Sequence, residues 1–246
     1  PQYLFYASQN YIKSENWEDA IIVLEEIISE YPESDFQKDA ASELEDAYLD
    51  FASELGSRSE YEEAVSWFKK YLETNPMLER NFLIDLRIDQ VFEDAPPYLV
   101  KELADSYYSS GAYHKAVFIY TILIEFNPDY LEVIIPPLVD SKISLAKSSP
   151  YNETLQPKRG RYIELEGESL LIFNNDTGFS MSSYLKGTES YIINIEAGGS
   201  AEIEVVSGEY ELLIELNTVD LLPFFGNRVY DEKRTYTEAF EIEEQE

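Results

Sequence analysis

The chain has 246 residues and no cysteine, so disulfide bonds, thiolate metal sites and cysteine catalysis are excluded. Its 49 acidic and 18 basic side chains leave a formal charge of −31, which repels phosphate backbones and anionic lipid. We therefore expect neither nucleic acid nor a membrane surface as a partner, and no stretch has the ~18 apolar residues that a membrane span needs. The charge has two readings that the sequence leaves open: a solvated surface that keeps the protein in solution, and an attraction for a basic partner or for divalent cations.

The compartment is also left open. The chain starts at Pro1, already inside a helical pattern, and no charged-then-apolar leader opens it. This start favours a secreted or surface-anchored protein whose leader or anchor has been removed, and a cytoplasmic location is the alternative. The oligomeric state and the identity of the partner are not determined by the sequence.

Residue usage along the chain predicts two domains. Twelve of the fifteen alanines lie before residue 147, whereas eight of the ten glycines lie after residue 159. Because Ala favours helix interiors and Gly marks turns between strands, we expect a helical domain at residues 1–147 and a β-rich domain at residues 162–246. The segment between them, residues 148–161, has two prolines, a glycine and no apolar period, as expected of a linker.

The helical part contains a repeat in which an Ala is followed twelve residues later by a Pro. The three pairs are Ala20 and Pro32, Ala64 and Pro76, and Ala116 and Pro128. Each block predicts one helix, because bulky apolar residues four and seven positions after the Ala line one face and the proline ends the helix. A second helical pattern precedes each block, most clearly from Val100 to Gly111, where the glycine ends it.

The order of helix, glycine turn, aromatic residue, helix and proline resembles the tetratricopeptide repeat. The matching residues are Leu4, Ala7, Ser8, Tyr11, Ala20, Leu24 and Pro32 in repeat one, and Leu103, Ala104, Tyr107, Gly111, Tyr113, Ala116, Tyr120 and Pro128 in repeat three. The resemblance covers residues 1 to about 147. It implies a solenoid of antiparallel helix pairs whose concave groove binds a protein or peptide.

In that family the first helix of each pair lines the groove, so the resemblance implies which side chains meet a partner. They are Phe5, Gln9 and Ile12 in repeat one, and Lys101, Asp105 and Tyr108 in repeat three. The two aromatic residues would supply most of the binding energy, since aromatic side chains are enriched at binding hot spots. The charged pair would set the direction and register of the ligand. The clamp of Lys and Asn residues by which some family members hold a carboxylate tail is not visible.

The spacing of the repeats departs from the family period of about 34 residues. Ala20 and Ala64 are 44 residues apart, and Ala64 and Ala116 are 52 residues apart. We place the first excess in a longer helix from Asp39 to Leu55, and the second in an extra helix between Met77 and Pro96.

The helical part is expected to close with a helix from Asp129 to Lys147. Two adjacent prolines, Pro136 and Pro137, interrupt this segment. Proline lacks the backbone N–H, and its ring clashes with the preceding turn. We therefore expect the closing helix to be broken or offset there.

From residue 161 onward the apolar period changes to two, which predicts strands. Six are expected, at residues 162–166, 170–173, 191–195, 201–206, 210–216 and 235–242. Apolar residues alternate with Glu, as in sheets buried on one side, and the turn spacing favours a small antiparallel β-sandwich. The stretch from Ile195 to Tyr210 resembles immunoglobulin-like or transthyretin-like accessory modules of bacterial surface proteins. That resemblance implies a stabilising or adhesive module.

Two adjacent aromatic residues, Phe224 and Phe225, lie between a proline and a glycine. Successive side chains of a strand point to opposite faces, so both cannot enter one core. Two readings stay open: a packed loop plug and an exposed contact patch. The second reading motivates an alternative function, in which the sandwich is a carbohydrate-binding or cell-surface adhesion module.

No motif predicts catalysis. The single histidine, His114, falls in the turn before a repeat helix, where the family tolerates almost any polar residue, and no hydrolase, zinc-protease or nucleotide-binding fingerprint occurs. The run Asn174 to Gly178 lacks the ligand series of a calcium loop and is interpreted as a turn. We therefore expect a protein that is not an enzyme, has no cofactor or metal, and acts as a scaffold for protein or peptide partners.

Overall fold

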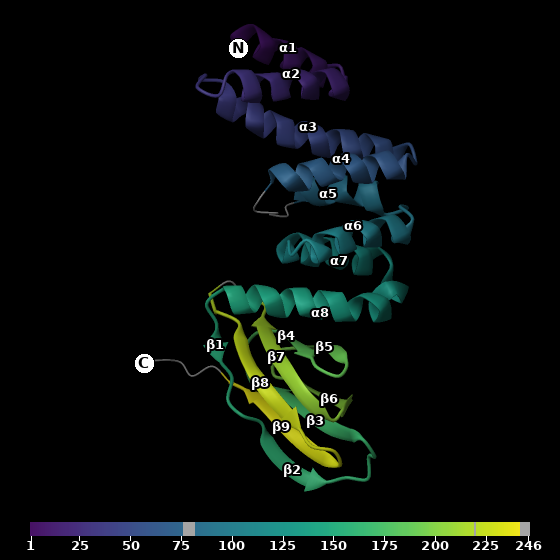
Figure 1. Ribbon diagram of the computed structural model, residues 1–246, viewed down its shortest axis with the longest axis vertical. Coiled ribbons are helices and arrows are strands. Elements are labelled where there is room, and N and C mark those ends of the chain that lie inside the picture. The colour runs from purple at the N-terminus through teal and green to yellow at the C-terminus, as the bar shows by residue number, and fades with distance from the viewer. Residues whose placement is uncertain (76–81, 219, 242–246) are drawn as a thin grey trace. The chain divides into compact units, whose positions relative to one another are not determined.

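The computed structural model describes residues 1–75, 82–218 and 220–241. Within these residues the chain has eight α-helices followed by nine strands in two sheets, which confirms the predicted helical and β-rich architecture (Figure 1). It forms two compact units, one from Pro1–Ser109 and Phe118–Pro128, the other from Ser110–Val117 and Asp129–Glu246. The last helix therefore belongs with the strands. The limits at residues 147 and 162, as boundaries of independently folding domains, stay a prediction.

Most of the helices follow one another in pairs joined by short turns. Their bounds are α1 Gln2–Lys13, α2 Trp17–Glu30, α3 Gln37–Ser57, α4 Tyr61–Thr74, α5 Phe82–Phe92, α6 Pro97–Ser109, α7 Tyr113–Phe126 and α8 Leu131–Ser148. The three alanines of the repeat, Ala20, Ala64 and Ala116, are fully buried. Gly111 ends α6 with a φ of 77°, a conformation that glycine adopts without strain. Of the three repeat prolines, Pro76 lies outside the described residues.

Both departures from the family period are visible in the helices. Helix α3 is the longest of those described, with 21 residues, as the first excess predicts. Helix α5 is the extra helix expected between residues 77 and 96. The closing helix α8, however, is continuous, so the prediction of a break at Pro136 and Pro137 is wrong. These prolines lie in the first two turns, where they remove only the hydrogen bonds to the carbonyls of residues 132 and 133.

The strands form two sheets that face each other. Their bounds are β1 Asn152–Glu153, β2 Lys158–Tyr162, β3 Glu168–Asn175, β4 Met181–Lys186, β5 Ser190–Ile195, β6 Ser200–Val206, β7 Gly208–Leu216, β8 Phe224–Tyr230 and β9 Arg234–Phe240. Sheet A has the order β1-β8-β7-β4-β5, and sheet B has the order β2-β9-β3-β6. The sandwich is not wholly antiparallel as predicted, because β1 pairs with β8 and β3 pairs with β9 in parallel. One apolar core draws residues from both sheets, including Phe173 and Tyr236 of sheet B and Leu212 and Ile214 of sheet A.

Several strand predictions need correction. Residues 162–166 were expected to be a strand, but the strand β2 ends at Tyr162 and lies mostly within the segment expected to be a linker. Strands β4 and β8 were not expected at all. The first is rich in Ser, and the second contains a glycine and a buried arginine, so neither shows the alternation of apolar and polar residues. The expected strand end at Ile242 lies outside the described residues.

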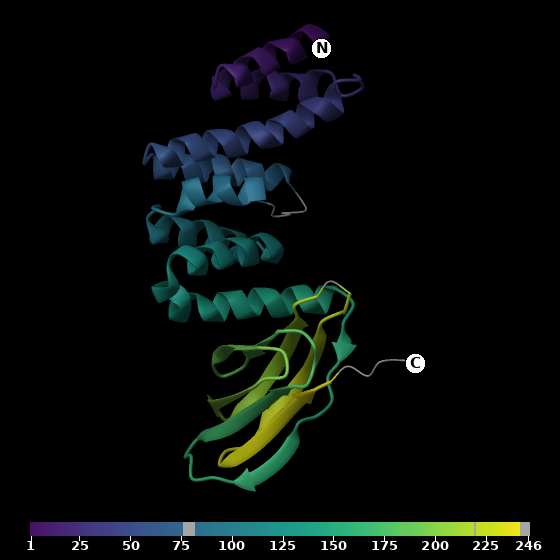
Figure 2. The ribbon, with the colours of Figure 1, turned by 180° about the vertical axis from the view of Figure 1, so that it is seen from behind.

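Helix α8 covers the face of sheet A that points away from sheet B. The register of the strands places Ile192, Tyr184, Leu213 and Phe225 side by side in one row across β5, β4, β7 and β8. This row packs on Val139, Ile143 and Ala146 of α8. Figure 1 and the opposite view in Figure 2 show α8 beside β4 and β7. Burial of sheet A on one side only, as the alternation predicted, is therefore wrong.

Ion pairs lie on both sides of this apolar row. Lys142 Nζ is 2.7 Å from Glu215 Oε2, and Lys186 pairs with Asp140. Burial acts to lower the pKa of Lys142, but the Glu215 carboxylate and the Tyr184 side chain together outweigh it and leave that pKa raised. The hydrogen bond that Lys186 donates to Asp140 likewise raises the pKa of Lys186. Both lysines therefore stay charged and hold α8 on the sheet.

Candidate functional site

Two of the groove residues expected in repeat one contact Phe36 and the start of helix α3. Phe5 is buried, with 7% of its surface exposed, and its ring centroid lies 5.3 Å from that of Phe36. Gln9 Nε2 donates a hydrogen bond of 3.0 Å to Glu43 Oε1, and Ile12 is half-buried. Phe5 therefore packs two helices together, and the expectation that it is open to a ligand is wrong.

The equivalent residues of repeat two are found by adding the 44-residue spacing. The groove positions 5, 9 and 12 of repeat one correspond to Leu49, Ser53 and Gly56 of α3, and the neighbouring positions 2 and 6 correspond to Asp46 and Asp50. The extra helix α5 lies on this set. Arg87 of α5 has Nη1 3.2 Å from Asp46 Oδ1 and Nε 2.7 Å from Asp50 Oδ1, and Ser53 Oγ donates to Gln90 Oε1. Burial raises the pKa of Asp50, and the Arg87 charge opposes that rise.

The contact between α3 and α5 is close and apolar beneath these polar groups. A Cβ atom added to Gly56 would lie 2.3 Å from the carbonyl oxygen of Gln90, so only glycine allows this approach. Ile88, Val91 and Phe92 are at most 1% exposed, and the Phe92 ring meets Phe68 edge-on at 4.8 Å. Burial of three such side chains contributes roughly 5–9 kcal/mol at 1.5–3 kcal/mol each. We conclude that α5 is a fixed wall on the inner face of repeat two.

In repeat three the expected residues form a polar network on α6. Lys101 Nζ lies 2.6 Å from Asp105 Oδ2, and Tyr120 of α7 donates a hydrogen bond of 2.7 Å to Asp105 Oδ1. Burial, together with this carboxylate, raises the pKa of Tyr120. Lys101 and Asp105 keep 30% and 40% of their side-chain surface exposed, and Tyr108 is half-buried. This face therefore stays accessible, but it is separated from repeat one by the covered face of repeat two.

The two most exposed aromatic residues of repeat one lie on α1 outside the expected groove positions 5, 9 and 12. Tyr3 is 83% exposed and Tyr6 is 53% exposed. They are three positions apart, so they are neighbours on the helix surface. Sequence reasoning missed them because the family pattern assigns them no packing role. That absence was the available signal, since a large aromatic residue outside the packing positions of a repeat helix must meet solvent or a partner.

The aromatic pair of the sandwich is packed on both sides of its strand. Phe225 is 7% exposed, belongs to the cluster under α8, and meets the Tyr151 ring at 5.2 Å. Phe224 is half-buried against the core between the sheets. Neither a loop plug nor an open contact patch describes them, because Phe224 and Phe225 lie in β8 and both faces of that strand are covered. Neither ring is freely exposed as a surface for a sugar to stack on.

A cavity of about 260 Å³ lies at one edge of the sandwich. Its walls are mainly apolar and come from Leu155, Ile214, Leu216, Phe224, Ala239 and Phe240. The remaining lining residues are the acidic Glu153, Asp176 and Glu241, together with Thr154 and Thr177. None of the residues that line this cavity, among those the structure describes, is basic.

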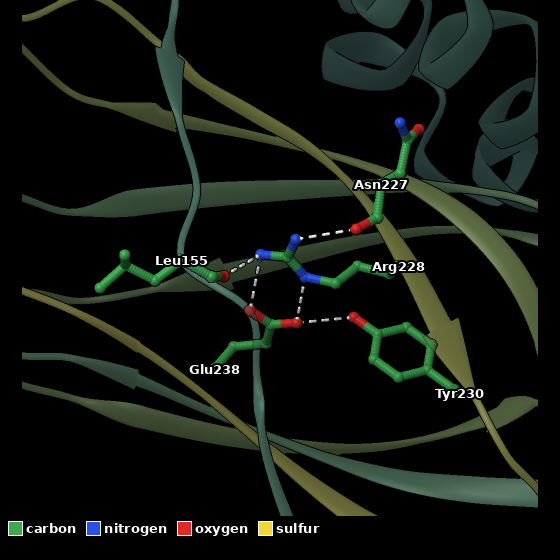
Figure 3. A network of polar contacts seen from close by, with 5 residues as sticks. All are labelled: Leu155, Asn227, Arg228, Tyr230 and Glu238. Carbon is green, nitrogen blue, oxygen red and sulfur yellow. Dashed lines mark hydrogen bonds and ion pairs between the residues drawn. The ribbon is translucent and has the colours of Figure 1, made fainter.

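A buried ion pair between the two sheets holds one wall of the cavity (Figure 3). Arg228 of β8 and Glu238 of β9 are 1% and 2% exposed and form two hydrogen bonds, of 2.6 Å and 3.0 Å. The same guanidinium donates from Nη2 to the carbonyl oxygen of Leu155 at 2.8 Å, and Tyr230 donates to Glu238 Oε1 at 2.8 Å. The segment that carries Leu155 is thereby tied to the sandwich core.

A second polar network holds the opposite wall. Asn175, which is fully buried, donates from its side-chain nitrogen to the carbonyl oxygens of Phe179 and Glu196 at 2.8 and 2.9 Å. Its oxygen accepts a hydrogen bond of 2.6 Å from Thr177. These bonds fix the turn after β3. Of the run Asn174 to Gly178 that was interpreted as a turn, Asn174 and Asn175 are instead the last residues of β3, and only the rest lies in the turn.

The helical geometry accords with the comparison against known families. Residues 2–34 match the family model of the tetratricopeptide repeat. The match covers α1, the turn and α2, including Ala20 and Pro32 of the repeat pattern. No curated protein matches the chain. Tetratricopeptide repeats mediate contacts between proteins and are typically not catalytic.

Outside the tetratricopeptide repeat, little in the described residues indicates other chemistry. His114 is exposed in the first turn of α7. Among the residues with described positions, no three His, Cys, Asp or Glu side chains come together as metal ligands would. No described helix combines the length and the apolar character needed to cross a membrane.

Proposed function

We propose that this protein is a non-catalytic scaffold that holds a partner protein or peptide on its helical repeats, with the β-sandwich as an accessory domain. The observation that carries the proposal is the exposed pair Tyr3 and Tyr6 on the first helix of the tetratricopeptide repeat. Tyrosine supplies a large contact area at a small cost in conformational entropy, and aromatic residues are enriched at binding hot spots.

The face that carries the two tyrosines is wide enough for one partner segment. Tyr3, Tyr6, Asn10 and Lys13 recur at intervals of three and four residues and are all exposed. This spacing places them on one stripe of α1. A partner helix that lays its apolar face along the stripe would bury both rings, which is a recurring mode of peptide recognition. The net charge of −31 favours a partner with basic residues.

The groove residues inferred from the family keep a place in this proposal. Gln9 and Ile12 lie to one side of the stripe on α1, and Lys101, Asp105 and Tyr108 form a separate contact surface on α6. Phe5 acts indirectly, because its buried ring holds α1 against the start of α3. The filled inner face of repeat two argues for short segments bound at either surface, and against one long peptide in a continuous groove.

Site-specific photo-crosslinking tests the proposal. A photoreactive phenylalanine replaces Tyr6 in one variant and Ile22 in another; Ile22 is 60% exposed on α2 and serves as the matched control. We expect a discrete crosslinked partner from position 6 and none from position 22. A third variant at Tyr108 reports on the α6 surface. Crosslinking at none of the three, or equally at all of them, would contradict the proposal.

Affinity measurements with the identified partner then assign the energy. The change of both Tyr3 and Tyr6 to Ala is expected to weaken binding by about tenfold or more, which is ~1.4 kcal/mol. Both side chains are exposed, so the thermal stability of the protein is expected to stay the same. Unchanged affinity in this double variant would remove the α1 stripe from the binding surface.

A further inference from the structure

We propose that the cavity at the edge of the sandwich is a second binding site, which takes one apolar side chain of a basic peptide. The site is separate from the tyrosine stripe of α1, and the inference does not depend on that surface. It rests on the size of the cavity, on the way its walls are held, and on the charges around it.

The size of the cavity selects a single side chain. An apolar cavity of about 150 Å³ in a protein core holds a benzene molecule, whereas pockets for whole ligands measure about 300–1,000 Å³. The cavity here, at about 260 Å³, lies between these limits. It has room for one aromatic or branched aliphatic group, and the apolar walls from Ile214, Leu216 and Phe224 match such a group.

The walls are held in place without a ligand. Leu155 is 85% exposed, yet its backbone is fixed by the hydrogen bond from the buried Arg228. On the other side, Asn175 and Thr177 lock the turn that carries Asp176. A site fixed in this way binds without a large loss of conformational entropy, since its own residues are already ordered. The exposed Leu155 side chain would gain an apolar contact when the cavity is filled.

The charges around the cavity select the rest of the ligand. Three acidic residues, Glu153, Asp176 and Glu241, belong to its lining, and within the described part of the chain no Lys or Arg does. Arg228 lies behind the wall, and its hydrogen bonds to Glu238 and to two backbone carbonyls occupy its guanidinium. A ligand with a positive charge beside its apolar group is therefore favoured, and an anionic ligand is repelled.

Calorimetric titration of the whole protein with three short peptides tests the proposal. The probes are the blocked tripeptides Lys-Phe-Lys, Lys-Ala-Lys and Glu-Phe-Glu. We expect saturable binding of the first, and binding at least about tenfold weaker for the other two, because one lacks the apolar group and the other reverses the charge. Absence of saturable binding by Lys-Phe-Lys, or equal binding of all three peptides, would overturn the proposal.

Two pairs of variants locate the site. Leu216→Trp fills the cavity and is expected to abolish binding of Lys-Phe-Lys, while Leu222→Trp, outside the cavity lining, is expected to leave it unchanged. If Leu216→Trp fails to fold by circular dichroism, Ala239→Trp at the exposed rim replaces it. Unchanged binding in the variant that fills the cavity would refute this location.

The charge variants separate local recognition from general attraction to an acidic protein. Glu153→Gln with Asp176→Asn removes two charges at the cavity, and Glu164→Gln with Glu166→Gln removes two exposed charges away from it. We expect at least about a threefold loss of Lys-Phe-Lys affinity in the first double variant and little change in the second. Equal losses would show that net charge alone attracts the peptide, and the proposed site would then be abandoned.

Discussion

Removal of the Glu238 charge by the change to Gln is expected to destabilise the sandwich strongly. The side chain is 2% exposed and bonds Arg228, which is 1% exposed. When one partner of such a buried pair is lost, the other charge remains in a low-dielectric interior, at a cost of about 3–5 kcal/mol. Since domains are stable by only about 5–15 kcal/mol, this change removes a large share of the total.

The magnitude is best measured as a double-mutant cycle. The variants are Glu238→Gln, Arg228→Met and the two together, with Glu204→Gln on the exposed side of β6 as a control expected to stay within about 0.5 kcal/mol. We expect the double variant to lose about 2 kcal/mol less than the sum of the singles, because it leaves no unpaired charge inside. Some cost remains, since the Leu155 carbonyl loses its donor.

Hydrogen exchange of the β8 and β9 amides is the suitable assay. Tryptophan fluorescence reports on the wrong place, because Trp17 and Trp67 both lie in the helical unit. Amide protection in the central strands follows the free energy of opening the sandwich. A loss of less than about 1 kcal/mol for Glu238→Gln, or strict additivity in the cycle, would refute the reasoning that the pair is a coupled, desolvated unit.

Three further predictions concern the rest of the molecule. Gly56→Ala is expected to lower the melting temperature, because the added Cβ would meet the carbonyl of Gln90. This steric effect is expected to outweigh the preference of helices for Ala over Gly, which is about 1 kcal/mol. An unchanged or higher melting temperature would contradict the close packing of α5 on α3. Burial, aided by Glu73, raises the pKa of Tyr107 to about 12, so the contribution of Tyr107 to stability is complete below pH 10 and is lost as the pH rises toward 12. Ultraviolet absorbance should show Tyr107 ionising at a higher pH than exposed tyrosines, and ionisation at the same pH would count against its burial. A fragment of residues 129–246 is expected to be folded by circular dichroism, whereas residues 162–246, which lack α8, are not; a folded shorter fragment would restore the boundary predicted from the sequence.

The helical repeats were predictable because their signals are local. A small residue at the closest helix approach and a proline beyond the helix end follow from sterics within a few residues, and Ala20, Ala64 and Ala116 are all fully buried as expected. The position of α5 was not predictable. Its existence follows from the spacing of the alanines. Its place on α3 depends on Gly56 and on the pairing of Arg87 with Asp46 and Asp50, and the periodicity of the sequence does not indicate these contacts.

The sandwich was harder to predict because two of its strands depend on distant partners. In β8 the inward position after Gly226 is Arg228, which reads as polar in the sequence and is buried only because Glu238 lies opposite. The covering of sheet A by α8 left one signal in the sequence. Leu212, Leu213 and Ile214 are consecutive and all fully buried, and a run of three apolar residues in a strand is typical of a sheet covered on both faces.

The candidate site residues, too, were predictable only in part. The family resemblance led to Lys101 and Asp105, which the structure places on an accessible helix face, but also to Phe5, which is buried. The cavity could not be foreseen, because its lining comes from five segments between residues 153 and 241 that only the folded sandwich brings together.

The filling of the inner helix faces has a mechanical consequence. A solenoid of helix pairs bends when neighbouring pairs slide past one another, as packed helices do in shear motions. In the helical unit, Phe36 and Glu43 contact the inner face of α1, and α5 packs on α3. Sliding at either place would break buried contacts, so we expect α1 to α5 to behave as a stiff rod, which keeps its curvature under load and leaves the partner to adapt its shape.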